Sequence, residues 1–200
     1  MLQRSIEAPL ESACVVIVRA SWDCQIEGYD GTRIIAETDN ALAGMQMKPK
    51  RNALEINFGG SGRVRVPFNS QLTIHAGRDA TVQNVRGPVL ANVGGSLHVT
   101  GCVVLMPCNA GKHMDIDCES LIEGDVRFHA GGNLRFHVHT LVEGRIMVND
   151  GAGYWEGRIG AGLTPVRLKC GGSFTLVTEQ PVSGTVLGHI EGPRAESHER

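Results

Sequence analysis

The stretch VLANVGGSLHV, residues 89–99, contains the pattern that decides the fold of this chain. Apolar residues alternate with other residues on both sides of a glycine pair: Val89, Ala91 and Val93 precede it, and Leu97 and Val99 follow it. Alternation with a period of two is typical of a strand with one buried face. Glycine suits a corner because it accepts positive φ and close backbone approach. The stretch therefore predicts two short strands joined by a tight corner.

The same pattern recurs along most of the chain. Each copy has a short alternating strand that ends at a glycine, and successive leading glycines are 17 to 20 residues apart. A period of this length indicates a repeat architecture, in which each unit stacks on the next and buries a shared core. The leading glycines, which we expect at the structural turns, are Gly59, Gly77, Gly94, Gly111, Gly131, Gly151 and Gly171.

We therefore predict an all-β fold: a single-stranded β-solenoid (β-helix) of about seven coils with 17–20 residues per coil and an N-terminal β cap. The alternative is a β-sandwich, in which regular hairpins also give evenly spaced strands. The solenoid is favoured because apolar residues occur at the same positions in each successive unit. In hairpins the apolar positions would instead be mirrored about each turn. A hydrophobic content of 42% can fill a core, and an aromatic content of 4% suits a narrow interior.

The domain organisation follows from this pattern. Residues 1–12 are expected to be a flexible N-terminus, residues 13–191 the solenoid, and residues 192–200 a disordered tail of polar and charged composition. Within the solenoid, residues 13–52 are predicted to form the cap, with three strands in 13–37 and a loop in 40–52, and residues 53–191 to form the coils. A cap is expected because a terminal coil otherwise exposes an unpaired strand edge.

Charge and targeting signals narrow the function classes. A net charge of −2 offers no broad basic surface, so we expect no nucleic-acid partner. The opening MLQRSIEAPLES lacks a basic region followed by a long apolar run, and the longest apolar stretch, residues 13–18, is too short to span a bilayer. We expect no membrane insertion and a cytoplasmic location.

The cysteines are predicted to be reduced and buried. Three lie in inward columns, where cysteine behaves as a small apolar residue, and the other three lack the CxxC spacing or histidine partner of a zinc site. Without an export signal, disulfides are not expected. The inward set is Cys108, Cys118 and Cys170, and the other set is Cys14, Cys24 and Cys102.

Several motifs together resemble the bacterial "putative adhesin" family. They are CVVIVRASWDCQIEGYDGTRIIAETD at residues 14–39, RVRVP at 63–67, and the turns VGGSLHV at 93–99, AGGNLRF at 130–136 and CGGSFTL at 170–176. The resemblance covers roughly residues 13 to 186 and implies a β-solenoid with recurring Gly-Gly turns and no assigned activity. Bactofilins, which are cytoplasmic β-solenoids that polymerise end to end, are a physical analogue.

One pair of predicted strands carries complementary charges. At a 20-residue offset, an acidic strand of Asp115, Asp117 and Glu119 lies beside a basic strand of Arg135, His137 and His139. We interpret this as a cross-strand charge ladder that fixes the register of the coils. The alternative is a divalent metal site made by Asp117, Glu119, His137 and His139, since imidazole and carboxylate suit zinc. The ladder is favoured because a flat strand face rarely converges tetrahedrally, so no metal is expected.

The segment GAGYWEGRIGAG, residues 151–162, interrupts the repeat. Glu156 and Arg158 replace apolar inward residues, and glycines break the strand pattern. The segment is predicted either to bulge outward or to form a loop that displays Tyr154 and Trp155, with Trp155 as an interface contact. It lacks the GxGxxG or GKS/T spacing of a phosphate-binding loop.

No nucleophile-elbow sequence or other catalytic motif is present, so we expect no enzyme activity and no cofactor. We predict a non-catalytic structural or scaffolding protein that associates with itself, or with another protein, through solenoid edges or faces. The alternative is an adhesin-like binding module that recognises a protein or carbohydrate surface; a third class, a metal-dependent enzyme, would carry stoichiometric metal. The predicted interface residues are Trp155, Tyr154, Val182, Val186 and Ile190.

Overall fold

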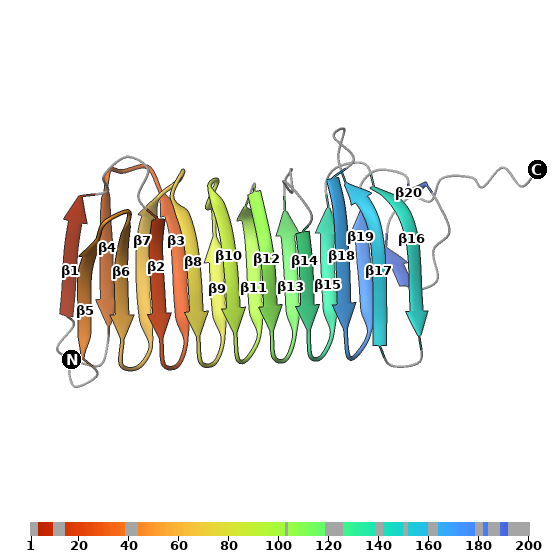
Figure 1. Cartoon of the computed structure of the whole chain (residues 1–200), viewed down its shortest axis with the longest axis horizontal. Helices are drawn as coiled ribbons and strands as arrows, with labels where there is room; N and C mark the ends of the chain where they lie inside the picture. Colours follow the sequence, from red (N-terminus) through yellow and green to blue (C-terminus); the bar gives the residue numbers. More distant parts are fainter. Residues whose placement is uncertain are drawn as a thin grey trace, which may run out of the picture.

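The computed structural model describes residues 4–9, 15–38, 44–102, 104–118, 126–138, 142–149, 152–159, 164–178, 182–183 and 189–191. Over these residues the fold is all-β, as the sequence predicts, and contains no helix long and apolar enough to cross a membrane. The strands form two mixed sheets rather than one uninterrupted coil; we call the ten-stranded one sheet A and the eleven-stranded one sheet B. Figure 1 shows the strands stacked along the long axis of the molecule.

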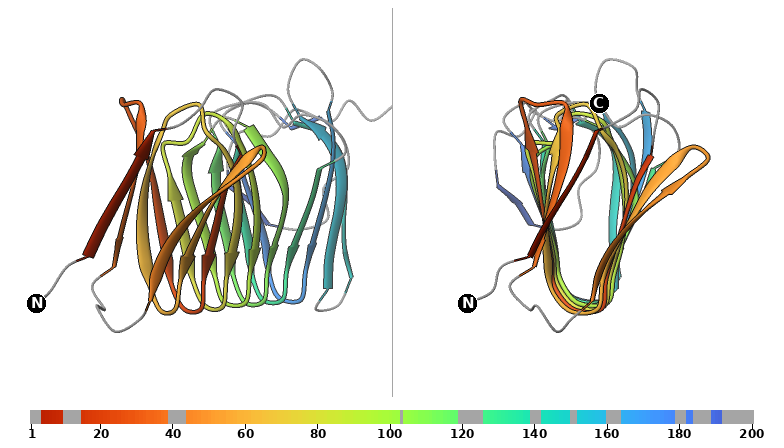
Figure 2. Two further views of the ribbon diagram at one scale, coloured as in Figure 1. Left: turned by 60° about the vertical axis from the view of Figure 1, so that its left-hand side comes forward. Right: turned by 90° about the vertical axis from the view of Figure 1, so that its left-hand side faces the viewer.

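Seven strand pairs cross from sheet B to sheet A through a tight turn, and we call each such pair with its turn a rung. The sheets face each other across a shared core, and the right-hand view of Figure 2 shows the U-shaped cross-section with the tight turns at its closed end. In stack order the rungs are β6 (Ala53–Phe58) with β7 (Gly62–Pro67), β2 (Val15–Ala20) with β3 (Cys24–Tyr29), β8 (Gln71–Ala76) with β9 (Ala80–Gln83), β10 (Pro88–Val93) with β11 (Leu97–Cys102), β12 (Val104–Ala110) with β13 (Met114–Cys118), β14 (Val126–Ala130) with β15 (Leu134–Val138), and β18 (Thr164–Cys170) with β19 (Phe174–Thr178).

The rung of β2 and β3 lies inside the stack, which corrects the prediction of a terminal cap over residues 13–52 for its first part, residues 15–29. β2 pairs in parallel with both β6 and β8, and β3 pairs in parallel with both β7 and β9. Val16, Val18 and Ile26 of this rung are fully or almost fully buried. The predicted cap contains the same alternation as every other rung, so residues 15–29 bury one face on each side of the two-sheet core.

Other strands close the end of the stack next to the β6–β7 rung. β4 (Arg33–Thr38) pairs antiparallel with β7, and β1 (Arg4–Pro9) pairs antiparallel with β4. In sheet B, β5 (Met45–Lys50) pairs antiparallel with β6, so a strand replaces the loop predicted for residues 40–52. The capping function predicted for this region is therefore supplied by β1, β4 and β5.

A hairpin interrupts the repeat at the other end. β16 (Val142–Asn149) and β17 (Ala152–Ile159) pair antiparallel, and β17 pairs antiparallel with β18, so all three stay in sheet B. The predicted coil with a corner at Gly151 is wrong, and Gly151 itself lies outside the described residues. In sheet A, β15 pairs directly with β19, Leu134 opposite Phe174. The short strands β20 (Val182–Ser183) and β21 (His189–Glu191) pair with β16 and β19.

The turn glycines are required by close contact between neighbouring turns. The amide N of Gly94 donates to the carbonyl O of Ala76 at 2.9 Å, and a Cβ on Gly94 would lie 2.4 Å from the carbonyl O of Gly77. Among the described residues, positive φ occurs at Asn84 and Gly101 only, so it is not what selects glycine at these corners. Of the two reasons for which the sequence predicts glycine, close approach is the one that applies.

The inward columns predicted from the alternation form the core. Leu72, Ile74 and Val99 are completely buried, and the rings of Phe128 and Phe136 from opposite sheets lie 5.4 Å apart. Burying one such side chain contributes about 1.5–3 kcal/mol. The core therefore fixes the sheets rigidly enough to hold their outward residues in a defined register.

Candidate functional site

A row of polar side chains crosses the outer face of sheet B, and we call it the polar ladder. Seven members immediately precede the last, inward-pointing residue of their strand, so alternation places them on the outer face. The eighth, Gln46, pairs with the ladder residue Asn57. The strand register puts every member directly beside the next. In stack order the ladder is Gln46, Asn57, Arg19, His75, Asn92, Asn109, His129 and Lys169.

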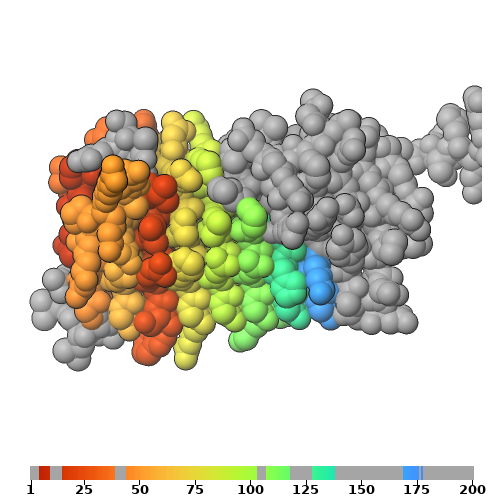
Figure 3. Space-filling model, viewed as in Figure 1, coloured from red at the N-terminus to blue at the C-terminus, as the bar shows by residue number. Residues whose placement is uncertain are grey.

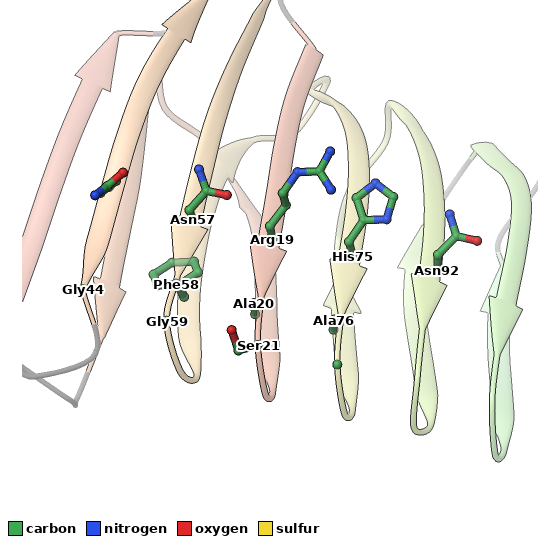
Figure 4. A pocket seen from close by; sticks show the side chains of 12 residues that line it. Arg19, Ala20, Ser21, Gly44, Asn57, Phe58, Gly59, His75, Ala76 and Asn92 are labelled. Atoms are coloured by element: carbon green, nitrogen blue, oxygen red, sulfur yellow. The ribbon is translucent and has the colours of Figure 1, made fainter.

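The outer face is hollowed along the first part of this ladder. A shallow groove with a volume of about 560 Å³ is lined by the ladder from Gln46 to Asn92 and by small residues of the adjoining turns, including Ser21, Gly59 and Gly77. Figure 4 shows Asn57, Arg19, His75 and Asn92 on neighbouring strands with their side chains on one face. The small turn residues leave room that larger side chains would fill, and the groove is therefore built into the repeat.

Arg19 is the central cation of the groove. Its side chain is 51% exposed, and its Nε donates to Oε1 of Glu55 at 3.1 Å. Lys50 Nζ lies 3.4 Å from the other oxygen of Glu55. Partial burial favours a higher pKa for Glu55, but the hydrogen bonds and charges of Lys50 and Arg19 outweigh it and lower the pKa. One carboxylate is therefore shared by two cations, and the cluster has net positive charge.

The amide and imidazole groups of the ladder supply hydrogen-bonding capacity without further carboxylates. Burial, and then the charge of Arg19, lower the pKa of His75, which favours the neutral imidazole with one donor and one acceptor nitrogen. Asn109 Nδ2 donates to Oδ1 of Asn92 at 2.9 Å, which aligns the two amides along the ladder. No ladder position holds Asp or Glu.

The outer face of sheet A differs in carrying carboxylates on several strands, and these lie beside basic side chains of the adjacent strands. His98 Nδ1 lies 3.3 Å from Asp115 Oδ2, and Arg65 Nε lies 3.9 Å from Glu27 Oε2. Arg63 donates to the side-chain oxygen of Gln25 at 2.9 Å. The described ion pairs of this face therefore join adjacent strands of the sheet, although Nε of Arg65 is buried without a hydrogen-bond partner.

The predicted acidic and basic strands lie in the predicted register on this face. Asp115 is opposite Arg135, Asp117 is opposite His137, and His137 Nδ1 lies 3.6 Å from Asp117 Oδ1. Glu119 and His139, the other two proposed metal ligands, lie outside the described residues. Within the part of the chain that the structure describes, no group of three or more His, Cys, Asp or Glu side chains is placed to hold a metal ion.

The predicted interface residues lie on strands at the far end of the stack. Tyr154 and Trp155 belong to β17, where their backbones pair with Lys169 and Leu168, so the segment is neither a bulge nor a loop. Val182 pairs with Val142, and Ile190 pairs with Leu176. Val186 lies outside the described residues. The structure therefore does not bring these residues into the groove, although β17 extends the ladder's row beyond Lys169.

Sequence reasoning missed the ladder and an exposed tryptophan. Trp22 is 49% exposed, the one large apolar side chain exposed among the residues whose burial the structure describes, and the guanidinium of Arg78 lies 5.4 Å from its ring centroid. It occupies the turn of the β2–β3 rung, next to the groove residue Ser21. Its signal in the sequence is a large aromatic residue at a turn position where four of the other six rungs have glycine and two have Arg78 or Lys112.

The described cysteines are buried, as the sequence predicts for Cys108 and Cys170: Cys24, Cys102, Cys108 and Cys170. Burial raises the pKa of Cys24 to about 12, which leaves it a protonated, unreactive thiol. Nothing in the described core therefore suggests thiol chemistry near the groove.

Comparison with known proteins finds no family and only weakly similar solved structures. No profile of a known protein family matches the chain and no curated protein matches it. Similar solved structures include a "putative cell adhesion protein" from Clostridium sporogenes (9% identity, 96% of this chain and 100% of that chain covered, TM-score 0.37) and a "putative adhesin" from Bacteroides fragilis (11%, 96% and 97%, 0.38). A "putative adhesin" from Parabacteroides merdae gives 10% identity, 95% and 93% coverage and a TM-score of 0.34. At these values the likeness assigns neither family nor function.

Proposed function

We propose that the protein is a non-catalytic, adhesin-like binding module that recognises a partner surface through the polar ladder and its groove. The observation that carries the proposal is the ladder itself: polar side chains in register across neighbouring strands, hollowed over the rung turns. Such an array is held in place by the backbone pairing of the sheet. Binding therefore requires little immobilisation of loops, which would otherwise cost binding free energy.

We interpret the two-sheet stack as a β-solenoid variant with seven described rungs, modified by the inserted β2–β3 rung and the β16–β17 hairpin. Parallel rungs lie about 4.8 Å apart, which sets the spacing between successive ladder groups. A fixed, repeating spacing of hydrogen-bonding groups suits an extended partner better than a compact small molecule. The cytoplasmic location expected from the N-terminal sequence stays a prediction, and the proposal concerns the binding surface alone.

The scaffold that assembles with itself is the second candidate, and the strand edges bear on it. The edge strand β5 carries Lys48, Pro49 and Lys50, and β1 ends at Pro9. Proline lacks an amide donor and lysines resist close approach, so both features oppose edge-to-edge addition at this end. Self-association would then depend on the end near β20 and β21, and the bactofilin analogy stays a prediction.

The test is a binding screen with matched variants on the two faces. The purified chain is applied to immobilised polysaccharides and peptides, beside a sheet B variant, Asn57→Ala/His75→Ala/Asn92→Ala, and a sheet A control, Gln25→Ala/Thr81→Ala/His98→Ala. Each lost hydrogen bond costs about 0.5–1.5 kcal/mol, so the sheet B variant should lose about tenfold or more in affinity. Equal binding by all three proteins would contradict the proposal, as would assembly that grows with protein concentration in the absence of any ligand.

A further inference from the structure

We propose that the partner is an extended acidic polysaccharide that lies along the polar ladder, across the strands of sheet B. This inference rests on the proposed binding function and adds the chemical class and direction of the ligand. It follows from three features: the direction of the groove, the composition of its lining, and the distribution of charge around it.

The direction of the ladder favours a chain-like ligand. The groove crosses β6, β2, β8 and β10, and the ladder continues past it to His129 and Lys169. Figure 3 shows this face, with orange β5 and β6, red β2, yellow β8 and green β10 in succession. In the right-hand view of Figure 2, the turn between β5 and β6 stands away from the rest of sheet B. A ligand that follows the ladder therefore runs along the stack axis.

The lining favours a polysaccharide over a peptide. An extended peptide commonly pairs with an exposed strand edge, but the nearest edge, β5, carries Pro49 between two lysines. A peptide bound to a sheet face needs apolar pockets for its side chains. In this groove the larger exposed side chains are amide, guanidinium and imidazole groups, whereas the apolar lining residues Phe58, Ala20 and Ala76 are almost fully buried. Trp22 adds an exposed ring beside Ser21, and an exposed ring stacks well on the apolar face of a sugar.

The charge distribution favours an acidic ligand. Arg19 and Lys50 share Glu55, Lys169 extends the ladder, and Arg78 lies over Trp22 at the adjoining turn. The ladder has no Asp or Glu, although the whole chain has a net charge of −2. Carboxylates of a bound polymer would therefore meet donors and cations along the ladder, where charge-assisted hydrogen bonds are the stronger kind.

The test uses one polymer backbone with and without its charge. Binding of the full chain to polygalacturonate is compared with binding to fully methyl-esterified polygalacturonate by isothermal titration calorimetry. The ladder variant is Arg19→Gln/Lys169→Gln, and the matched control is Arg63→Gln/Lys112→Gln, which removes two cations elsewhere. Far-UV circular dichroism and thermal unfolding verify that each variant folds.

We expect polygalacturonate to bind at least about tenfold more tightly than its methyl ester. The ladder variant should lose about tenfold or more in affinity for polygalacturonate, because one or two charge-assisted contacts are removed. Affinity should fall with rising salt. Equal binding of both polymers would overturn the acidic inference and leave the binding function standing. Ladder-dependent binding of peptides or of single-stranded RNA in preference to both polymers would overturn the polysaccharide class. Absence of ladder-dependent binding to any probe would overturn the proposed function as well.

Discussion

The outer faces of the two sheets are built from the same rungs but use their polar residues differently. On sheet A, His98 lies beside Asp115 and Arg65 lies beside Glu27, so basic and acidic side chains face each other across adjacent strands. On sheet B, Arg19 and Lys50 share Glu55, but the polar ladder itself has no carboxylate and is hollowed by a groove. Two sheets with a register fixed by a common core can therefore have outer faces of different kinds. On one face acidic and basic side chains lie beside each other on several strands, and on the other a row of polar side chains lines a groove that is open to a ligand.

The largest expected effect comes from disturbing the turns on which both faces depend. Gly94→Ala places a Cβ 2.4 Å from the carbonyl O of Gly77, so the neighbouring turns must separate. We expect a loss of about 2–4 kcal/mol in the free energy of unfolding, measured by denaturant titration, and loss of binding with it. Gly44→Ala is the matched control, because a Cβ there meets nothing within 4 Å. Equal stability of both variants would contradict the close-approach explanation.

The next effect comes from placing a carboxylate in the polar ladder. Asn92→Asp keeps the oxygen that accepts from Asn109 but introduces a negative charge beside His75. We expect binding to polygalacturonate to weaken by about tenfold or more, since one unfavourable charge contact costs on the order of 1–2 kcal/mol. Thr81→Asp, at an outward position of sheet A, is the control and should leave the affinity unchanged. An unchanged affinity for Asn92→Asp would remove the ladder from the binding surface.

A smaller effect is expected from breaking a charge pair of sheet A. Asp115→Asn removes the exposed partner of His98, and such pairs are worth well under about 1 kcal/mol. We expect a small drop in the midpoint of thermal unfolding that disappears in high salt, and no change in ligand affinity. A loss of affinity as large as that of the sheet B variants would show that the two faces are not functionally distinct.

The smallest effect concerns the titration of His75. Burial and the charge of Arg19 lower the pKa of His75 in the folded state, so the unfolded chain binds this proton more readily. The stability that neutral His75 contributes to the folded state is therefore fully present above the ordinary histidine pKa of about 6.5. This stability is lost as the pH falls through the lowered pKa of His75 in the folded state. His75→Gln should flatten the stability profile over that acidic range, whereas Asn92→Ala should not. A profile unaltered by His75→Gln would show that His75 is not the group responsible.

Much of the fold can be predicted from the sequence because it depends on local pattern. The alternation around the turn glycines identifies the buried residues, such as Ile74 and Leu97, and the 20-residue offset places Asp117 beside His137. The position of the β2–β3 rung cannot be read in this way. Its turn, Ser21-Trp22-Asp23, lacks the glycine pair, and its alternation fits any level of the stack.

The ladder escaped prediction for the same reason. Arg19 becomes a neighbour of Asn57 and His75 only because the β2–β3 rung lies between two rungs that follow each other in the chain. Polar residues at alternating positions look like ordinary solvated strand residues until the register is known. The sequence instead predicts Tyr154 and Trp155 as interface residues, because their segment interrupts the repeat.

The most direct test of the two-face account uses histidines as reporters in a single molecule. The native chain is modified with diethylpyrocarbonate with and without polygalacturonate, and the modification of each histidine is quantified by mass spectrometry. We expect protection of His75 and His129 on sheet B and no protection of His98 on sheet A. Protection of His98 alone, or equal protection of both faces, would contradict the two-face account.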